Sequence, residues 1–315
     1  MYNAKHMNMT STAIQATIPY VEEAVISVNG LEIAYDSFGS PNDPPLLLVG
    51  GLGMSLIGWD PDFCRLLADQ GFWVIRFDNR DVGHSSKLDQ FGVPSILSLL
   101  KMIVNQPPEA GYTLTDMAAD AVGLLDMLGI QAAHVVGMSM GGMIAQTMAI
   151  SHPERLLTLT SIMSSTNDPS LPLPQWRAMV ALLQPMPEDK EEHIRQSRKV
   201  WQMLNGPGYP LDIGRHRRIM EQAQARGFHP AGTARQLAAI GASGSRREAL
   251  RQVRVPTLVI HGDADPLVPL EGGIDTAESI PNASLHIIPG LGHALPPEVW
   301  PLVVEEIVAH VAGSK

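Results

Sequence analysis

Cysteine is nearly absent from this sequence, and so is any long hydrophobic run. The single cysteine, Cys64, excludes an intramolecular disulfide. Its apolar neighbours Phe63, Leu66 and Leu67 favour a buried thiol on the inner face of a helix. No apolar stretch is long enough to span a bilayer, and the polar N-terminus has no signal-peptide core. We therefore expect a cytoplasmic protein in which residues 1–20 form a flexible tail.

Concentrated positive charge is also missing. The chain carries 22 Lys and Arg residues against 32 Asp and Glu residues, a formal net charge of -10. The basic residues are scattered, apart from short groups such as Arg215, Arg217 and Arg218. Nucleic acids and anionic membranes are bound by dense basic surfaces, so neither is expected as a partner.

The remaining composition is that of an ordinary globular protein. Hydrophobic residues make up 45% of the 315 residues and charged residues 17%, which is sufficient for a large buried core. A chain of this length fits one large α/β domain that carries an insertion. The sequence carries no signal of oligomeric state.

Short apolar runs alternate with helical patterns along most of the chain. The first two runs, 25–28 and 31–35, flank Asn29-Gly30, a strong signal for a two-residue hairpin. Apolar runs follow at 46–49 and 73–77, and further strands are predicted at 134–137, 156–161, 257–260 and 285–288. Helical patterns lie at 63–70, 115–128, 141–150 and 297–311. Unbroken runs between helices predict parallel strands that are buried on both faces.

The alternation stops between residues 166 and 251. Proline-rich segments there alternate with helical stretches that carry Trp176 and Trp201. We interpret residues 166–251 as a helical cap inserted into the sheet domain. The core domain then consists of residues 21–165 and 252–315.

The sharpest chemical signal is the pentapeptide Gly137-Met138-Ser139-Met140-Gly141. It matches G-x-S-x-G and stands between a predicted strand and a predicted helix. In such a turn the serine hydroxyl projects above the sheet, and the glycines allow the backbone to close tightly. A serine hydroxyl becomes nucleophilic beside a base that is itself oriented by an acid. Ser139 is therefore the candidate nucleophile.

Two later loops supply the candidate acid and base in the chain order that this motif requires. Asp265 follows one predicted strand, and His293 follows the next in a loop that contains glycine. Of the 11 histidines, only His293 follows the last strand in a glycine loop, whereas His261 and His286 lie at a strand end or inside a strand. The alternative is a set of ordinary glycine turns in a parallel α/β protein.

With these motifs the chain resembles the α/β-hydrolase family from about residue 24 to residue 311. The resemblance implies a mostly parallel, eight-stranded sheet flanked by helices, with a helical cap insertion. It also implies that the acid is the fourth residue of a G-x-x-D turn, which is Asp265. Asp263 is the alternative acid, although it can equally be a turn residue that bonds its own backbone. Because no histidine-rich ligand set lies near these carboxylates, neither a metal nor a cofactor is expected.

Ester chemistry also needs two N–H donors for the oxyanion of the tetrahedral intermediate. The N–H of Met140, at the helix start, is the first candidate. The second is expected in the glycine-rich loop 49–53, where the resemblance assigns the N–H of Leu52. Family members commonly have His-Gly at the positions of Gly50 and Gly51, so this loop departs from their pattern.

Two further stretches carry the resemblance. The segment from Asp78 to Ser85 is similar to the family's D-x-R-G-x-G-x-S turn, with Asp81 in place of a glycine, and we interpret it as structural. Residues 46–59 and 288–296 look especially like bacterial methylesterases that act on polyketide antibiotics of the aclacinomycin type.

Candidate pocket residues lie near Ser139 in sequence or in the cap. Methionines suggest an adaptable apolar pocket, although they are equally ordinary as core residues. Cap tryptophans could line the acyl or alcohol site, or simply pack against the sheet domain. The candidates are Gly51, Met54, Met138, Met140, Met143, Trp176 and Trp201.

Together these features predict a serine hydrolase that cleaves small-molecule carboxylic esters through an acyl-enzyme, with methyl and short-chain acyl esters as candidates. A cofactor-free perhydrolase or haloperoxidase-like enzyme is one alternative, because the same three side chains can pass an acyl group to peroxide. Peptidases and C–C bond hydrolases are further alternatives. Haloalkane dehalogenases and epoxide hydrolases are disfavoured, since they have aspartate where this chain has Ser139. Outside enzymes, the alternative is a non-catalytic small-molecule receptor on the same fold.

Overall fold

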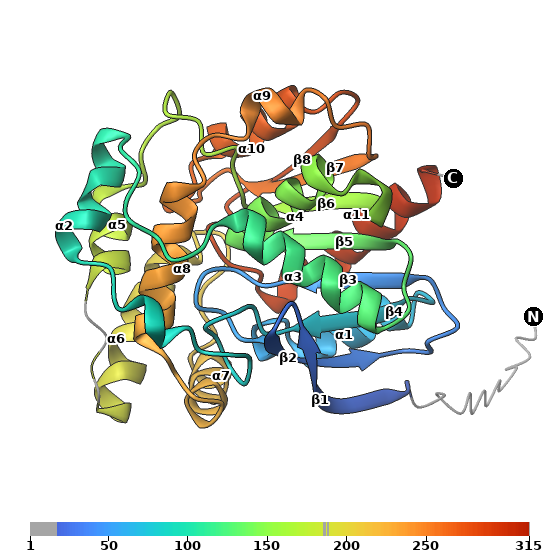
Figure 1. Cartoon of the computed structure of the whole chain (residues 1–315), viewed down its shortest axis with the longest axis horizontal. Helices are drawn as coiled ribbons and strands as arrows, with labels where there is room; N and C mark the ends of the chain where they lie inside the picture. The colour runs from blue at the N-terminus through green and yellow to red at the C-terminus, as the bar shows by residue number, and fades with distance from the viewer. Residues whose placement is uncertain (1–17, 185–186, 188, 315) are drawn as a thin grey trace, which may run out of the picture.

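The computed structural model describes residues 18–184, 187 and 189–314, and it contains one eight-stranded sheet (Figure 1). The strands are β1 (Tyr20–Val28), β2 (Leu31–Phe38), β3 (Pro45–Val49), β4 (Trp73–Phe77), β5 (Ala133–Met138), β6 (Leu156–Ile162), β7 (Thr257–Gly262) and β8 (Ser284–Ile288). Their order across the sheet is β1-β2-β4-β3-β5-β6-β7-β8. β2 pairs antiparallel with β1 and with β4, and all other neighbouring strands are parallel. The predicted mostly parallel sheet is confirmed.

The first two strands form the hairpin that the sequence predicts. Asn29 and Gly30 have φ angles of 52° and 78°, and positive values at both positions are what a type I′ turn requires. Tyr20 is the first residue of β1, and its hydroxyl donates to Asp36 Oδ2 (3.0 Å). The predicted tail of residues 1–20 therefore overlaps the start of the sheet, while its first 17 residues lie outside the described part of the chain.

Both faces of the sheet are buried beneath helices. On β3, Leu47 packs into the cluster formed with α3 (Leu114–Met127) and α4 (Met140–Ser151). Its neighbours Leu46 and Leu48 point the other way, into the cluster formed with α1 (Pro61–Ala68) and α11 (Trp300–Gly313). All three leucines are fully buried. This two-sided burial explains why the parallel strands are continuous apolar runs.

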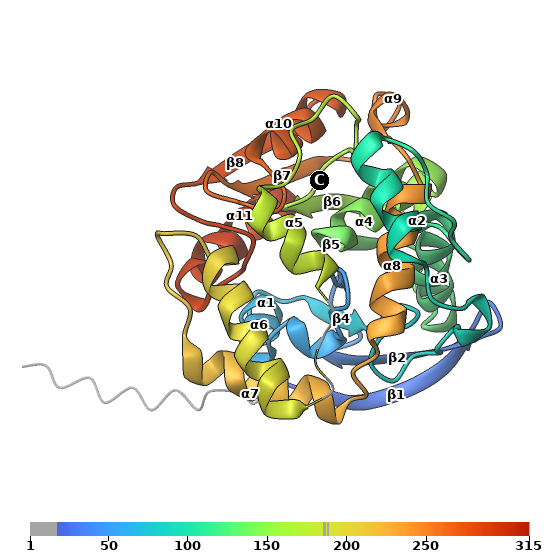
Figure 2. The same ribbon diagram turned by 90° about the vertical axis from the view of Figure 1, so that its left-hand side faces the viewer.

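A helical insertion lies between β6 and β7, as predicted. It contains α5 (Trp176–Leu183), α6 (Lys190–Leu204), α7 (Ile213–Ala225) and α8 (Pro230–Ala242), and the short α9 (Arg247–Leu250) follows. Figures 1 and 2 show α5 to α8 gathered on one side of the sheet domain. These four helices and their connecting loops are named the cap below. The exact division of the chain at residues 166 and 251 stays a prediction.

One helical segment beside the cap has no counterpart in the sequence prediction. The helix α2 (Ile96–Leu100) continues into a 3₁₀ turn, η3 (Lys101–Val104), and contacts α8. Figure 2 shows α2 next to α8 on the cap side. Five helical residues are too few to show a 3.6-residue periodicity. Between residues 18 and 314, leaving aside 185, 186 and 188, no helix combines the length and the apolar character needed to cross a bilayer.

A second unpredicted helix, α10 (Leu270–Ser279), contains two consecutive glycines, which lower helix propensity. Tertiary packing requires them. A Cβ at Gly273 would lie 2.4 Å from His261 Nδ1, and one at Gly272 would lie 2.7 Å from Ser165 Cβ. Local propensity is overridden here because the helix packs directly against the strand that carries His261.

Candidate active site

Ser139 occupies the turn between β5 and α4. Its φ of 56° and ψ of -120° are rare for a residue with a side chain and are typical of a nucleophile on a strand-to-helix turn. The Ser139 N–H donates to the carbonyl of Ile162 on β6 (2.8 Å). The strained conformation is therefore held by the adjacent strand.

Two glycines allow this turn to lie against its neighbours. A Cβ at Gly141 would lie 2.0 Å from the carbonyl oxygen of Val49, and one at Gly137 would lie 2.2 Å from the carbonyl oxygen of Gly141. Both distances are far below van der Waals contact. The glycines of the pentapeptide are thus required by close backbone approach.

Ser139, His293 and Asp265 form one hydrogen-bonded series. Ser139 Oγ lies 2.9 Å from His293 Nε2, and His293 Nδ1 lies 2.7 Å from Asp265 Oδ2. An imidazole that donates from Nδ1 to a carboxylate has Nε2 available to accept the serine proton. The fold therefore brings together three residues that the sequence predicts as nucleophile, base and acid.

Backbone groups fix the orientation of the acid and the base. Asp265 Oδ1 accepts the N–H groups of Leu267 (2.8 Å) and Val268 (2.9 Å), which leaves Oδ2 for His293. The His293 N–H donates to the carbonyl of Leu204 at the end of α6 (2.6 Å). Asp265 is 6% exposed and His293 is 8% exposed. The cap thus contacts the loop that carries the base.

The carboxylate on the His293 imidazole is that of Asp265, and the alternative acid, Asp263, bonds to another loop group. Its residue is exposed, and its Oδ1 accepts the N–H of Gly290 (2.6 Å). This is the bonding pattern of a carboxylate that fixes a loop.

The competing histidines have other partners. His261 is fully buried, and its Nε2 donates to the carbonyl of Val268 (2.8 Å). Burial is the largest effect on His261 and lowers its pKa, so the imidazole is held neutral. His286 pairs with Glu306 (3.0 Å) on α11. Neither histidine is bonded to Ser139.

The predicted oxyanion donors flank Ser139. Neither the N–H of Leu52 nor that of Met140 has an acceptor among the described residues. Met140 begins α4, where the N–H groups of a helix have no partner within the helix. A Cβ at Gly51 would lie 3.4 Å from Ser139 Cβ, so the loop that carries Leu52 passes close to the serine.

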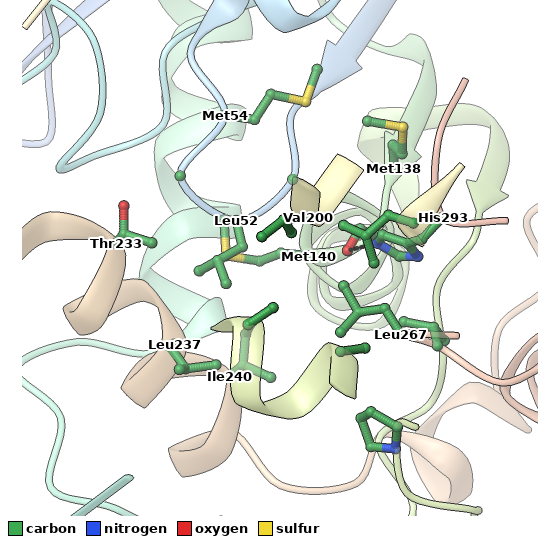
Figure 3. A pocket seen from close by; sticks show the side chains of 18 of the residues that line it. Leu52, Met54, Met138, Met140, Val200, Thr233, Leu237, Ile240, Leu267 and His293 are labelled. Atoms are coloured by element: carbon green, nitrogen blue, oxygen red, sulfur yellow. Dashed lines mark hydrogen bonds between the residues drawn. The ribbon is translucent and has the colours of Figure 1, made fainter. Parts of the chain in front are cut away.

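A cavity of about 1230 Å³ lies between the cap and the sheet domain, with Ser139 and His293 in its wall. Figure 3 shows Leu52, Met140 and His293 facing it from the sheet domain, with Leu237 and Ile240 opposite on α8. The predicted pocket residues in its lining are Gly51, Met54, Met138, Met140, Met143 and Trp201. The predicted methionine-rich apolar environment is therefore adjacent to Ser139.

Trp176 is the predicted pocket residue that the structure places elsewhere. It is 66% exposed, and the Arg177 guanidinium lies 5.3 Å from its ring centroid. At the start of α5, the residues that line the cavity are Ala178 and Met179. Trp176 therefore lies on the outer face of the helix.

Part of the cavity wall comes from residues that the sequence prediction does not include. Val93, Ile96 and Met102, in and beside α2, line the cavity next to the cap helix α8. The available signal is the apolar run at 96–104, which no predicted element explains. Among the residues that the structure describes, no group of three His, Cys, Asp or Glu side chains could hold a metal ion.

Comparison with known proteins finds relatives that cover most of the chain. A family model for the alpha/beta hydrolase fold matches residues 44–298. The chain is 33% identical over 314 residues to the rhodomycin D methylesterase DnrP of Streptomyces peucetius, covering 89% of this chain and 94% of the relative. It is 30% identical over 296 residues to a 2-hydroxy-6-oxononadienedioate/2-hydroxy-6-oxononatrienedioate hydrolase of Burkholderia vietnamiensis, covering 90% and 93% of the two chains.

A solved structure supports the same architecture. The meta-cleavage product hydrolase of Pseudomonas fluorescens IP01 superposes with a TM-score of 0.73 at 20% identity. The match covers 93% of this chain and 98% of that chain. At this identity the likeness supports the fold alone.

Proposed function

The chain belongs to the α/β-hydrolase fold family, and from that premise we propose that it hydrolyses carboxylic esters with Ser139 as the nucleophile. The observation that carries this proposal is the hydrogen-bonded series from Ser139 through His293 to Asp265. The 33% identity to a methylesterase over most of the chain supports the same reaction type.

In the first half of the proposed reaction, His293 Nε2 takes the Ser139 hydroxyl proton while Oγ bonds to the ester carbonyl carbon. The carbonyl oxygen becomes an oxyanion, which can accept hydrogen bonds from the free N–H groups of Leu52 and Met140. Asp265 keeps the imidazole in the tautomer that accepts this proton and stabilises the imidazolium. The C–O bond to the alcohol then breaks, and His293 gives its proton to the leaving oxygen.

In the second half, water replaces the alcohol. His293 takes a proton from water as the water oxygen bonds to the acyl carbon, and the second oxyanion occupies the same donors. Collapse breaks the bond to Oγ, and the proton returns from His293 to Ser139. The products are the free acid and an unchanged enzyme.

We further propose that the substrate is a bulky, uncharged ester. The cavity exceeds the upper end of typical small-molecule pockets, roughly 1,000 Å³, and several of the residues beside Ser139 are methionines. Its apolar rim includes Val93 and Ile96, which are 64% and 60% exposed. The relative DnrP is by name a methylesterase of rhodomycin D, and methyl esters of large polycyclic acids would occupy such a space.

The charges around the cavity disfavour a dianionic substrate such as the dioate in the name of the Burkholderia relative. Among the described residues in the lining, Arg215 is the one arginine, and it is paired with Asp60. Asp168, Asp212 and Glu298 also line the cavity. The second carboxylate of a dianionic substrate would lie among acidic side chains, with no unpaired arginine among the described lining residues to bind it.

The experiment is a panel of p-nitrophenyl esters and methyl esters of bulky aromatic acids, assayed with the wild type and Ser139→Ala. The wild type is expected to hydrolyse both types of ester. Ser139→Ala is expected to lose roughly 10⁴-fold or more of kcat while remaining folded. Equal rates for the two proteins, or cleavage of a dioate substrate in preference to every ester, would reject the proposal.

A further inference from the structure

Gln236, on cap helix α8, bonds to the loop that carries the oxyanion donor Leu52. Its side chain is fully buried, and its Oε1 accepts the N–H of Gly53 (2.8 Å). Its Nε2 donates to the carbonyl of Arg80 in the sheet domain (2.8 Å). Both ends of the amide are therefore satisfied, and each contact joins the cap to the core.

The Gly53 N–H that Gln236 accepts belongs to the central peptide of a tight turn. The Met54 N–H donates to the Gly51 carbonyl (3.1 Å), so Leu52 and Gly53 are the two central residues of a turn. Gly53 has a φ of 64°, which a residue with a side chain rarely adopts. Gln236 therefore fixes the peptide immediately after Leu52, and the direction of the Leu52 N–H depends on the same turn.

A second cap residue supports this contact. A Cβ at Gly53 would lie 2.8 Å from Thr233 Oγ1, one turn earlier on α8. The loop is thus packed against the helix as well as bonded to it.

The core bonds to this segment before and after the turn, and the bond after it runs from the Leu56 N–H to Asp78 Oδ1 (2.6 Å). The position where family members commonly carry a histidine is Gly50, which has no side chain. Its carbonyl accepts a bond from Asn79 Nδ2 (3.1 Å), and that contact lies three residues before Gly53. Within the described residues, Gln236 is the side chain that bonds to the second half of the turn.

We propose that Gln236 is a positioning residue that holds the Leu52 N–H in line with the developing oxyanion. The proposal rests on the ester hydrolysis proposed above. It makes the cap part of the catalytic machinery, because transition-state stabilisation then depends on α8 being docked. Gln236 itself does not line the cavity, so its substitution removes no direct contact with a bound ester.

The test is Gln236→Leu, compared with Gln224→Leu. Gln224 is also a cap glutamine, and its Nε2 lies 3.0 Å from a ring nitrogen of His193, so the control removes a cap hydrogen bond without touching the loop. Loss of one oxyanion donor typically costs about 10²–10³ in kcat. We expect Gln236→Leu to lose about 10- to 100-fold in kcat, with KM within about threefold of wild type. Gln224→Leu should retain kcat within about threefold.

Inhibitor binding separates positioning from general destabilisation. A trifluoromethyl ketone forms a hemiketal oxyanion on serine, whereas the matching methyl ketone binds as a ground-state ligand. The Ki of the trifluoromethyl ketone should rise by the same factor as kcat falls, while the Ki of the methyl ketone stays constant. If Gln236→Leu does not fold, Gln236→Met keeps the side-chain length and should give the same result.

A folded variant with wild-type kcat, or one in which both ketones weaken equally, would overturn the role of Gln236. Neither result bears on the proposed function, because that depends on the wild type and Ser139→Ala. A wild type without esterase activity would reject the proposed function itself.

Discussion

Asp81 in the sheet domain and Arg235 on cap helix α8 form a buried bidentate ion pair. The Arg235 guanidinium donates to the two Asp81 carboxylate oxygens at 2.6 and 2.9 Å, and the side chains are 2% and 0% exposed. Asp81 also accepts the Tyr112 hydroxyl (2.7 Å). Its φ of 72° lies in the left-handed region, which explains why related turns have glycine there. Asp81, which replaces the glycine of the family's turn, is therefore the residue that binds the cap.

Removing the charge at Asp81 should destabilise the protein strongly. Asp81→Asn leaves the buried Arg235 guanidinium, among the described residues, paired only with the exposed carboxylate of Asp89 (2.9 Å), and breaking a buried pair on one side typically costs about 3–5 kcal/mol. Asparagine tolerates the left-handed backbone, so added strain is excluded as the cause. Urea unfolding should show this loss in the free energy of unfolding. A loss below about 1 kcal/mol would contradict the role of the pair.

The same variant should alter the dependence of stability on pH. Burial is the largest effect on Asp81 and raises its pKa, but Arg235, the Leu88 N–H and Tyr112 together lower it below the usual value. A lowered pKa contributes stability that is full above the unfolded-state value, about 3.9, and that is lost as pH falls through the folded-state value. The stability gap between wild type and Asp81→Asn should therefore be constant near neutral pH and narrow below about pH 4. A gap that widens on acidification would contradict this.

Cys64 should be chemically inert in the native protein. The thiol is fully buried, and burial raises its pKa to about 12. At pH 8 about 10⁻⁴ of the thiol is ionised, and none of its surface is accessible. Ellman's reagent should therefore react within minutes in guanidinium chloride and negligibly in native buffer over the same time. Rapid native labelling, or loss of esterase activity on alkylation, would contradict the buried position.

Substitutions at two neighbouring aspartates should have very different effects on kcat. Asp265→Asn disturbs the His293 tautomer and is expected to lower kcat by about 10⁴-fold, with the protein still folded. Asp263→Asn should stay within about threefold of wild type in kcat, because its carboxylate bonds to Gly290 rather than to the imidazole. The measurement is kcat for both variants on one p-nitrophenyl ester. A larger loss of kcat in Asp263→Asn than in Asp265→Asn would identify Asp263 as the catalytic acid instead.

Of two glycine-to-alanine substitutions in helices, one should lower kcat and the other should stabilise the protein. Gly141→Ala places a Cβ 2.0 Å from the Val49 carbonyl oxygen, so the turn at Ser139 must move. At Gly214 in α7, the nearest atom to such a Cβ is 3.5 Å away, an ordinary contact. Gly141→Ala should lower kcat by at least about 100-fold, since small misplacements of reacting groups are costly, whereas Gly214→Ala should stabilise by about 0.5–1 kcal/mol. An active Gly141→Ala would contradict the observed packing.

The strands, the first hairpin and the three site residues could be predicted from the sequence because each depends on residues that are close together in the chain. Continuous apolar runs become parallel strands wherever both faces of a sheet are covered, and Asn29-Gly30 turns because both residues tolerate positive φ. Ser139, Asp265 and His293 were identifiable because each follows a strand, and the carboxyl ends of parallel strands meet at one edge.

Other features depend on partners that are remote in sequence. Gln236 bonds to Gly53, 183 residues away, and nothing in the local pattern marks it. Trp176 and Trp201 are the same residue type in the same cap, yet one is exposed and the other lines the cavity. Their difference arises from how each helix docks, which local patterns do not encode.

The most direct measurement is the reaction of the protein with a fluorophosphonate, followed by intact mass and peptide mapping. The wild type is expected to gain one phosphonyl group, located on Ser139. His293→Ala is expected to label at least about 10³-fold more slowly, because Ser139 then lacks its base. No adduct on the folded wild type, or an adduct on another residue, would contradict the assignment of Ser139 as a nucleophile activated by His293 and Asp265.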